Sequence, residues 1–248
     1  MILILGGTTE ASALARLLAG RSDMPALLSL AGRTMNPGAQ PIPTRVGGFG
    51  GATGLADFFA AKGVRAVIDA THPFAGQISA NAALACAETD TPLLVLRRHP
   101  WSPQPGDAWT EVADAQAAAE ALGRKPVRVF LTVGRLELPT FLDFPQHHYV
   151  IRTIDPPEAL PPDSRLILDR GPFDEAAERA LLAQEKIEVL VTKNSGGTAT
   201  YAKIAAARAL GLPVILMRPP DWPDATCVDT PEAALAWIKG LGKQDKAR

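Results

Sequence analysis

Small, hydroxylated and charged residues follow the first apolar run of the sequence in an order suited to binding an anion. The run 2–5 leads into Gly6, Gly7, Thr8, Thr9 and Glu10, and a helical pattern follows from residue 11 to residue 18. Glycines let the backbone bend where a Cβ would clash, and the first N–H groups of a helix point at an anion in the bend. The pattern predicts a nucleotide-phosphate site. A plain strand-to-helix turn with a capped helix is the alternative.

The dinucleotide fingerprint G-x-G-x-x-G/A is matched only in part. Counted from Gly6, Thr8 stands where a second glycine is required, and Ala11 supplies the small residue. The hydroxyls of Thr8 and Thr9 can contact a phosphate or cap the helix, and Glu10 is favourable in a first helical turn. We therefore assign this turn to the cofactor or to the floor of the binding cleft.

Arg33 follows the predicted second strand, residues 25–31. At this point of a dinucleotide-binding fold an acidic residue favours NAD, whereas an arginine accommodates the 2′-phosphate of NADP. Arg33 therefore favours NADP. A solvated surface charge is the alternative.

Two further turns of the first half carry residues able to do chemistry. His72 precedes Pro73, which disfavours helical geometry and indicates a rigid turn at the end of strand 66–69. His72 could donate to a substrate or cofactor, or it could be structural. Arg97 and Arg98 directly follow strand 93–96, which indicates a binding site for an anion or a charged edge.

The second half repeats the arrangement of a strand followed by small, hydroxylated and basic residues. One turn follows strand 127–131 and the other follows strand 189–191, where a cation, two polar side chains and two glycines precede a helix. Both are suited to a phosphate or a carboxylate. The candidate residues are Thr132, Gly134, Arg135, Lys193, Asn194 and Ser195.

Tyr201 and Lys203 are two residues apart in the predicted helix 198–210. They do not share a helix face, so they cannot form the four-spaced Tyr/Lys pair of short-chain dehydrogenases.

Apolar runs alternate with helical patterns along the chain, which predicts an α/β protein with parallel strands. The predicted strands are 2–5, 25–31, 66–69, 93–96, 127–131, 149–154, 165–168, 189–191 and 214–217. The predicted helices are 11–18, 54–62, 78–88, 114–122, 174–185, 198–210 and 231–241. Because the alternation restarts after Gly123, we place a domain boundary between residues 123 and 124.

Composition excludes several classes of protein. Apolar residues make up 47% of the 248 residues and the formal net charge is −1, unlike a disordered chain or a basic nucleic-acid-binding protein. No apolar run approaches the ~20 residues of a membrane span, and no basic segment precedes the first one. Cys86 and Cys227 have no metal-spaced partners, so we interpret both as packing residues in a reducing compartment. We expect a cytoplasmic protein without metal, nucleic-acid partner or membrane partner.

Taken in order, these motifs resemble the precorrin-6A reductase family over nearly the whole chain. The resemblance is carried by residues 6–10, 31–33, 71–75, 132–135 and 193–197. It implies a cobalamin-pathway enzyme that uses NADPH to reduce one double bond of precorrin-6A, giving precorrin-6B. It also implies an α/β fold of two Rossmann-like three-layer domains, 1–123 and 124–248, with mostly parallel sheets facing across a cleft that holds cofactor and tetrapyrrole. Other cobalamin-pathway enzymes are its candidate partners.

The resemblance gives each candidate residue an expected role. A polycarboxylated tetrapyrrole needs basic contacts, which Arg98, Arg170 and Lys203 supply as substrate-binding residues. Hydride transfer belongs to the nicotinamide, and His72, Tyr201 or water supplies the proton. The residues expected to bind NADPH are Gly6, Gly7, Thr8, Thr9, Glu10, Arg33, Thr132, Gly134, Arg135, Lys193, Asn194 and Ser195.

Two alternatives remain open. Another NADP-dependent reductase or epimerase of the extended short-chain class would carry a Tyr-x-x-x-Lys pair, which this sequence lacks. A nucleotide- or tetrapyrrole-binding module without turnover would not oxidise NADPH when precorrin is added.

Overall fold

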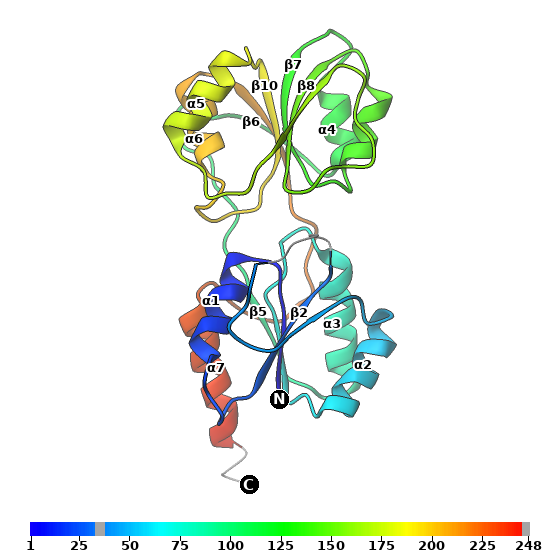
Figure 1. Ribbon diagram of the computed structural model, residues 1–248, viewed down its shortest axis with the longest axis vertical. Helices are drawn as coiled ribbons and strands as arrows, with labels where there is room; N and C mark the ends of the chain where they lie inside the picture. Colours follow the sequence, from blue (N-terminus) through cyan, green and yellow to red (C-terminus); the bar gives the residue numbers. More distant parts are fainter. Residues whose placement is uncertain (33–37, 245–248) are drawn as a thin grey trace. The chain divides into compact units, whose positions relative to one another are not determined.

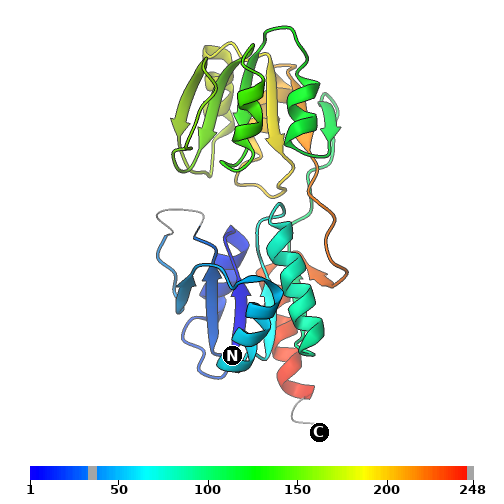
Figure 2. The same cartoon turned by 90° about the vertical axis from the view of Figure 1, so that its right-hand side faces the viewer.

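The chain folds into two α/β units, each built on one parallel sheet (Figures 1 and 2). The computed structural model describes residues 1–32 and 38–244, with side chains described as far as residue 241. The first unit comprises Met1–His99 and Pro220–Arg248, and the second comprises Pro100–Pro219. The predicted α/β class with two Rossmann-like domains is confirmed.

In the first unit, helices cover both faces of a six-stranded sheet of order β12-β5-β4-β1-β2-β3. The strands are β1 (Ile2–Leu5), β2 (Ala26–Leu30), β3 (Thr44–Val46), β4 (Ala66–Asp69), β5 (Leu93–Leu96) and β12 (Thr226–Val228). The helices are α1 (Thr9–Leu18), α2 (Gly51–Lys62), α3 (Gly76–Glu88) and α7 (Pro231–Gln244). Figure 1 shows α1 and α7 against one face of the sheet and α2 and α3 against the other.

The central strand β1 is buried on both faces, which explains why its sequence is continuously apolar. Ile2 and Ile4 join a core cluster that includes residues of α1 and α7. Leu3 and Leu5 join a second cluster with residues of α2 and α3. Alternate side chains of one strand thus fill both layers of the core.

The second unit repeats this plan with a six-stranded sheet of order β6-β11-β10-β7-β8-β9. The strands are β6 (Ala108–Val112), β7 (Arg128–Thr132), β8 (His148–Thr153), β9 (Ser164–Leu168), β10 (Val189–Lys193) and β11 (Pro213–Met217). The helices are α4 (Ala115–Ala121), α5 (Glu175–Gln184) and α6 (Ala202–Ala209), with a short 3₁₀ helix, η1 (Leu138–Asp143). In Figure 1, α5 and α6 cover one face and α4 covers the other.

Each sheet has one edge strand that pairs with a strand distant in the sequence, β6 in the second unit and β12 in the first. β6 precedes every other strand of the second sheet and pairs with β11, whereas β12 follows the second unit and pairs with β5 of the first sheet. The structure therefore divides the chain at residues 99/100 and 219/220, and not at the predicted boundary 123/124. The strand-to-helix rhythm could not show this, because β6 and α4 lie before residue 124 although they belong to the second unit.

Two other expectations require correction. The strands β3, β6 and β12 and the helix η1 were not predicted. Cys86 is buried as expected, and burial raises the pKa of its thiol to about 12, but Cys227 is exposed and is not a packing residue.

A buried ion pair fastens α5 to the second sheet. Arg152 of β8 donates from Nη1 and Nη2 to the two carboxylate oxygens of Glu178 at 2.5 and 2.8 Å, and both side chains are almost completely buried. The guanidinium also lies over the ring of Phe173, 3.6 Å from its centroid.

Replacing Glu178 with Gln should lower the free energy of unfolding by about 3–5 kcal/mol, because the Arg152 charge would stay buried without a counterion. Urea unfolding of purified protein measures the change. Glu175→Gln is the matched control, since Glu175 lies in the same first turn of α5 but is exposed, and its effect should stay within about 0.5 kcal/mol. Equal effects of the two substitutions would contradict this account of the pair.

Candidate active site

The predicted glycine turn lies where the strand order of the first sheet reverses. β1 pairs with β2 on one side and with β4 on the other. In open parallel sheets, ligands bind outside the carboxyl ends of the strands at such a point. The turns after β1 and β4 therefore form the candidate site of the first unit.

Gly6 and Gly7 are required for different reasons. A Cβ on Gly6 would lie 2.6 Å from Cδ1 of Leu28, a β2 residue that is only 1% exposed. Gly7 has a φ of +124°, a conformation that residues with a side chain rarely adopt. The first glycine thus provides room for packing, and the second provides the bend.

Thr8 connects the two turns of this site. Its Oγ1 accepts a hydrogen bond from the Ala11 N–H at 3.1 Å, so Thr8 is the N-cap of α1. The same hydroxyl donates to the Ala70 carbonyl at 2.8 Å, which joins the end of β1 to the end of β4. Thr8 therefore orients the amino end of α1 toward the turn that contains His72.

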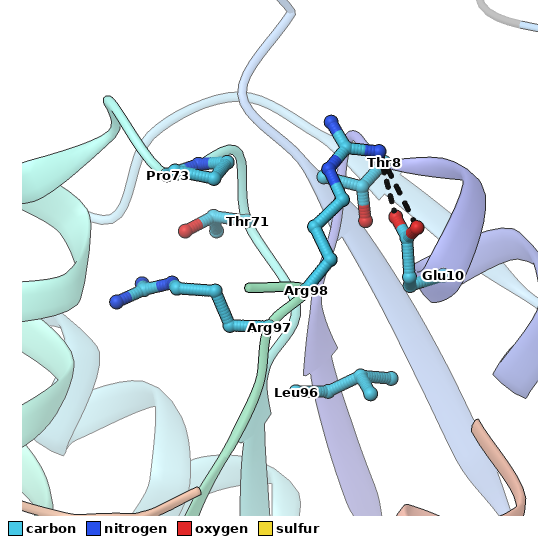
Figure 3. A pocket seen from close by; sticks show the side chains of 7 residues that line it. All are labelled: Thr8, Glu10, Thr71, Pro73, Leu96, Arg97 and Arg98. Atoms are coloured by element: carbon cyan, nitrogen blue, oxygen red, sulfur yellow. Dashed lines mark hydrogen bonds and ion pairs between the residues drawn. The ribbon is translucent and has the colours of Figure 1, made fainter. Parts of the chain in front are cut away.

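Glu10, in the first turn of α1, forms an ion pair with Arg98 (Figure 3). Nη1 of Arg98 lies 3.3 Å from both carboxylate oxygens of Glu10. The hydroxyl of Thr9 also donates to Glu10, at 3.0 Å. Arg98 thus neutralises the carboxylate that would otherwise repel an anion from the amino end of α1.

A second, buried group of polar side chains lies behind the turn after β4. Asp69 accepts hydrogen bonds from the N–H and the hydroxyl of Thr71 at 3.1 and 2.7 Å. Nη2 of Arg97 lies 3.4 Å from Asp69 and donates to Ser79 at 3.2 Å. Burial lowers the pKa of the Arg97 guanidinium, and the Asp69 carboxylate counteracts this shift. In Figure 3, Arg97 points away from Glu10 and Arg98, so the two neighbouring arginines serve different environments.

His72 is oriented by its own turn. Its Nδ1 accepts a hydrogen bond from the Phe74 N–H at 3.2 Å, and its carbonyl accepts one from the Ala75 N–H at 2.8 Å. An accepting Nδ1 places the proton of a neutral imidazole on Nε2. The neutral ring can therefore donate a hydrogen bond through Nε2.

The second unit brings its two predicted turns together in the corresponding place. β7 and β10 are neighbours at the reversal of strand order, so Thr132, Gly134 and Arg135 lie beside Lys193 and Ser195 at one edge of the sheet. Arg135 is exposed, and the others are buried or partly buried. The two predicted turns thus follow neighbouring strands of the sheet.

Glu137 also lies at this edge and was not predicted. Nζ of Lys193 lies 2.5 Å from Oε1 of Glu137, and a Cβ on Gly134 would lie 2.7 Å from Oε2. Gly134 thus leaves room for this ion pair. The charge of Lys193 is partly neutralised by the protein itself, which leaves Arg135 as the exposed cation of the turn.

Asn194 has a contact that sequence reasoning did not anticipate. Its side-chain oxygen accepts from the Trp101 N–H at 2.7 Å, and its side-chain nitrogen donates to the Trp101 carbonyl at 3.0 Å. The indole of Trp101 also donates to the Gly197 carbonyl at 2.7 Å. The side chain of Asn194 therefore holds the segment that enters the second unit.

Lys203 and Tyr201 also contact the protein itself. Lys203 is 5% exposed and donates to the Thr200 carbonyl at 3.0 Å. The Tyr201 hydroxyl accepts from Nη2 of Arg208 at 2.6 Å, and Arg208 in turn pairs with Asp107 at 2.8 Å.

The carboxyl edge of the second sheet also exposes apolar side chains. Leu136, Ile154 and Leu168 follow or end the neighbouring strands β7, β8 and β9, and they are 61%, 50% and 52% exposed. Arg170, which is exposed, comes two residues after Leu168. This edge thus combines apolar contact surface with cationic groups.

Arg33, predicted to favour NADP, lies outside the described residues. Within the ranges that the structure describes, no group of three or more His, Cys, Asp or Glu side chains is placed to hold a metal ion. In the same ranges, no helix is both long and apolar enough to cross a membrane.

Comparison with known proteins identifies the family. The sequence model of the family described as Precorrin-6x reductase CbiJ/CobK matches residues 1–239. The chain belongs to this family.

Relatives in the precorrin-6x reductase family match over nearly their full lengths. Precorrin-6A reductase of Rhodobacter capsulatus is 51% identical over 97% of this chain and 96% of its own. Cobalt-precorrin-6A reductase of Priestia megaterium is 30% identical over 89% of this chain and 91% of its own. A solved structure described as CobK precorrin-6A reductase superposes with a TM-score of 0.91 at 51% identity, covering 97% of this chain and 96% of that one.

Replacing Gly6 with Ala should lower the free energy of unfolding by about 1–3 kcal/mol, because the new methyl group would overpack against the buried Leu28. Gly240→Ala is the control, since Gly240 lies in α7 with open space around it, and the substitution should be neutral or stabilise by up to about 1 kcal/mol. Urea unfolding curves of both variants test this account, which fails if Gly6→Ala is as stable as the unsubstituted protein.

Proposed function

We propose that this protein is a cytoplasmic, NADPH-dependent precorrin-6A reductase. It reduces one double bond of the macrocycle to give precorrin-6B in cobalamin biosynthesis. The observation that carries the proposal is the family match across residues 1–239, which includes both units.

The first unit offers a site compatible with a dinucleotide. Gly7 provides the bend, and Thr8 fixes the amino end of α1 beside the turn after β4. Because Arg98 neutralises the Glu10 carboxylate, a phosphate at this turn would meet less repulsion. We assign residues 6–10 to NADPH, which supplies a hydride when it is bound.

We propose that the turns of the second unit contribute further contacts to anionic groups of NADPH. Arg135 is exposed at the reversal of strand order, and Thr132, Lys193 and Ser195 lie at the same edge. A guanidinium can bind a phosphate through two parallel hydrogen bonds.

The carboxyl edge of the second sheet suits the substrate. A precorrin is a broad apolar ring with many carboxylates, so it needs apolar contacts and cations on the same surface. Ile154 and Leu168 supply exposed apolar area, and Arg170 lies next to them in the sequence. We assign these residues to the tetrapyrrole, together with Arg98 of the first unit.

We propose His72 as the residue that delivers a proton to the carbon next to the hydride acceptor. Protonation of its ring gives an imidazolium, and release of one proton to the carbon restores the neutral ring whose Nδ1 accepts the hydrogen bond from the Phe74 N–H. The Tyr201 hydroxyl, the second candidate, is bound by Arg208. A group that donates a proton must be held in a fixed orientation, and the turn after β4 provides this for His72.

The test of the whole proposal is NADPH oxidation by the purified protein on addition of precorrin-6A. We expect oxidation only with both compounds present, and faster with NADPH than with NADH. Binding of NADPH without oxidation would instead support a module that binds nucleotide or tetrapyrrole without turnover.

Arg135→Ala should raise the KM for NADPH at least tenfold, equivalent to about 1.4 kcal/mol, because a contact to an anionic group is lost. Arg124→Ala is the control, since Arg124 is exposed but precedes β7 and so lies at the opposite edge of the sheet. Steady-state kinetics with varied NADPH measures both. An unchanged KM for NADPH in Arg135→Ala would refute the cofactor role of Arg135.

Ile154→Asn should raise the KM for precorrin-6A by about fivefold to tenfold and leave the KM for NADPH unchanged, because it removes apolar area that would be buried against the ring. Leu84→Asn, on the exposed face of α3, should change neither constant. If Ile154→Asn alters only the KM for NADPH, the assignment of this edge to the tetrapyrrole is wrong.

A further inference from the structure

The turn after β4 is held at both of its ends. A residue of β4 holds one end, and a residue distant in the sequence holds the other. At the first end, Asp69 binds the N–H and the hydroxyl of Thr71. At the other end, the carbonyl of Pro73 accepts a hydrogen bond of 3.0 Å from the indole Nε1 of Trp222. His72 lies between these two attachments.

Trp222 contacts the same buried group through the face of its ring. The Arg97 guanidinium lies over the indole, 4.0 Å from the ring centroid, and its Nη2 contacts Asp69 and Ser79. Among the described residues, Nε and Nη1 of Arg97 are buried without a hydrogen-bond partner. The electron-rich ring face therefore adds to the Asp69 carboxylate in offsetting the burial of this cation.

The segment that carries Trp222 also packs on the helix that follows the turn. Pro220 lies against Gly76, the first residue of α3, where an added Cβ would come within 3.3 Å of the proline ring. Residues 218–225 connect β11 of the second sheet to β12 of the first. Within the first unit, Pro220 and Trp222 thus attach this segment to the turn that holds His72 and to the helix after it.

We propose that Trp222 is a positioning residue for the reduction, acting through the Pro73 carbonyl and the Arg97 guanidinium to hold the turn from Thr71 to Pro73. This inference rests on the proposed function, which places His72 near the reacting atoms. Trp222 acts on this turn through Pro73 on one side and through Arg97 and Asp69 on the other.

The two contacts of Trp222 can be separated by substitution. Phenylalanine keeps an aromatic face for Arg97 but cannot donate a hydrogen bond to the Pro73 carbonyl. Alanine removes both contacts. Trp222→Phe is therefore the informative variant, and Trp222→Ala is the more severe comparison.

Trp222→Phe should lower kcat by about fivefold to tenfold with little change in the KM for NADPH, as expected for the loss of one hydrogen bond that orients a group in the reaction. Amide hydrogen exchange of residues 71–76 should become faster, while exchange in β7 and β10 should not change. Trp237→Phe in α7 is the matched control and should change neither kcat nor exchange in residues 71–76.

The following outcomes would contradict the positioning role of Trp222. Unchanged kcat in Trp222→Phe, or a lower kcat without faster exchange in residues 71–76, overturns the proposal. A fall in kcat that matches only a loss of folded protein, seen as an unfolding midpoint below the assay temperature, also overturns it. If the unsubstituted protein fails to oxidise NADPH with precorrin-6A, the proposed function fails, and faster exchange in Trp222→Phe would then show a purely structural attachment.

Discussion

The hydroxyl of Thr8 takes part in two hydrogen bonds on which the site of the first unit depends. It accepts one from the Ala11 N–H and donates the other to the Ala70 carbonyl, and each interaction would be lost without the oxygen. Because one atom both caps α1 and bridges β1 to β4, the direction of the helix and the path of the neighbouring turn are set together. Gly6 and Gly7 allow this geometry, since the first approaches Leu28 closely and the second has a positive φ.

Much of the fold could be predicted because the central strands are buried on both faces. Runs such as 2–5 and 189–191 contain only apolar residues, which is typical of strands covered on both faces, and they lie in the middle of each sheet. The edge strands β3 and β12 have three residues each, and most residues of β3, β6 and β12 are exposed. Their sequences lack a periodic signal, so their sheet membership depends on pairing between distant residues. The domain boundary was misplaced for the same reason.

The candidate site was predictable where chemistry follows directly from position at the end of a strand. Residues 6–10, 132–135 and 193–195 lie at the reversal points of the two sheets, as strand order requires. The contacts of Glu137, Asp69 and Trp222 could not be predicted, because each joins residues that are distant in sequence or separated by a turn. Asn194 shows the opposite limit: its type and place suggested a ligand contact, but its amide is used to hold Trp101.

The late position of β12 in the sequence has a consequence for folding during synthesis. Synthesis proceeds from the amino end, so β5 and the four strands on its inner side leave the ribosome before the residues of the second unit. The outer hydrogen-bonding groups of β5 then remain open until β12 emerges more than 120 residues later, after the whole second sheet. An open strand edge can pair with another chain, which makes the nascent first sheet the stage most exposed to aggregation. The second unit has a shorter delay of the same kind, because β6, its first strand, pairs with β11, its last.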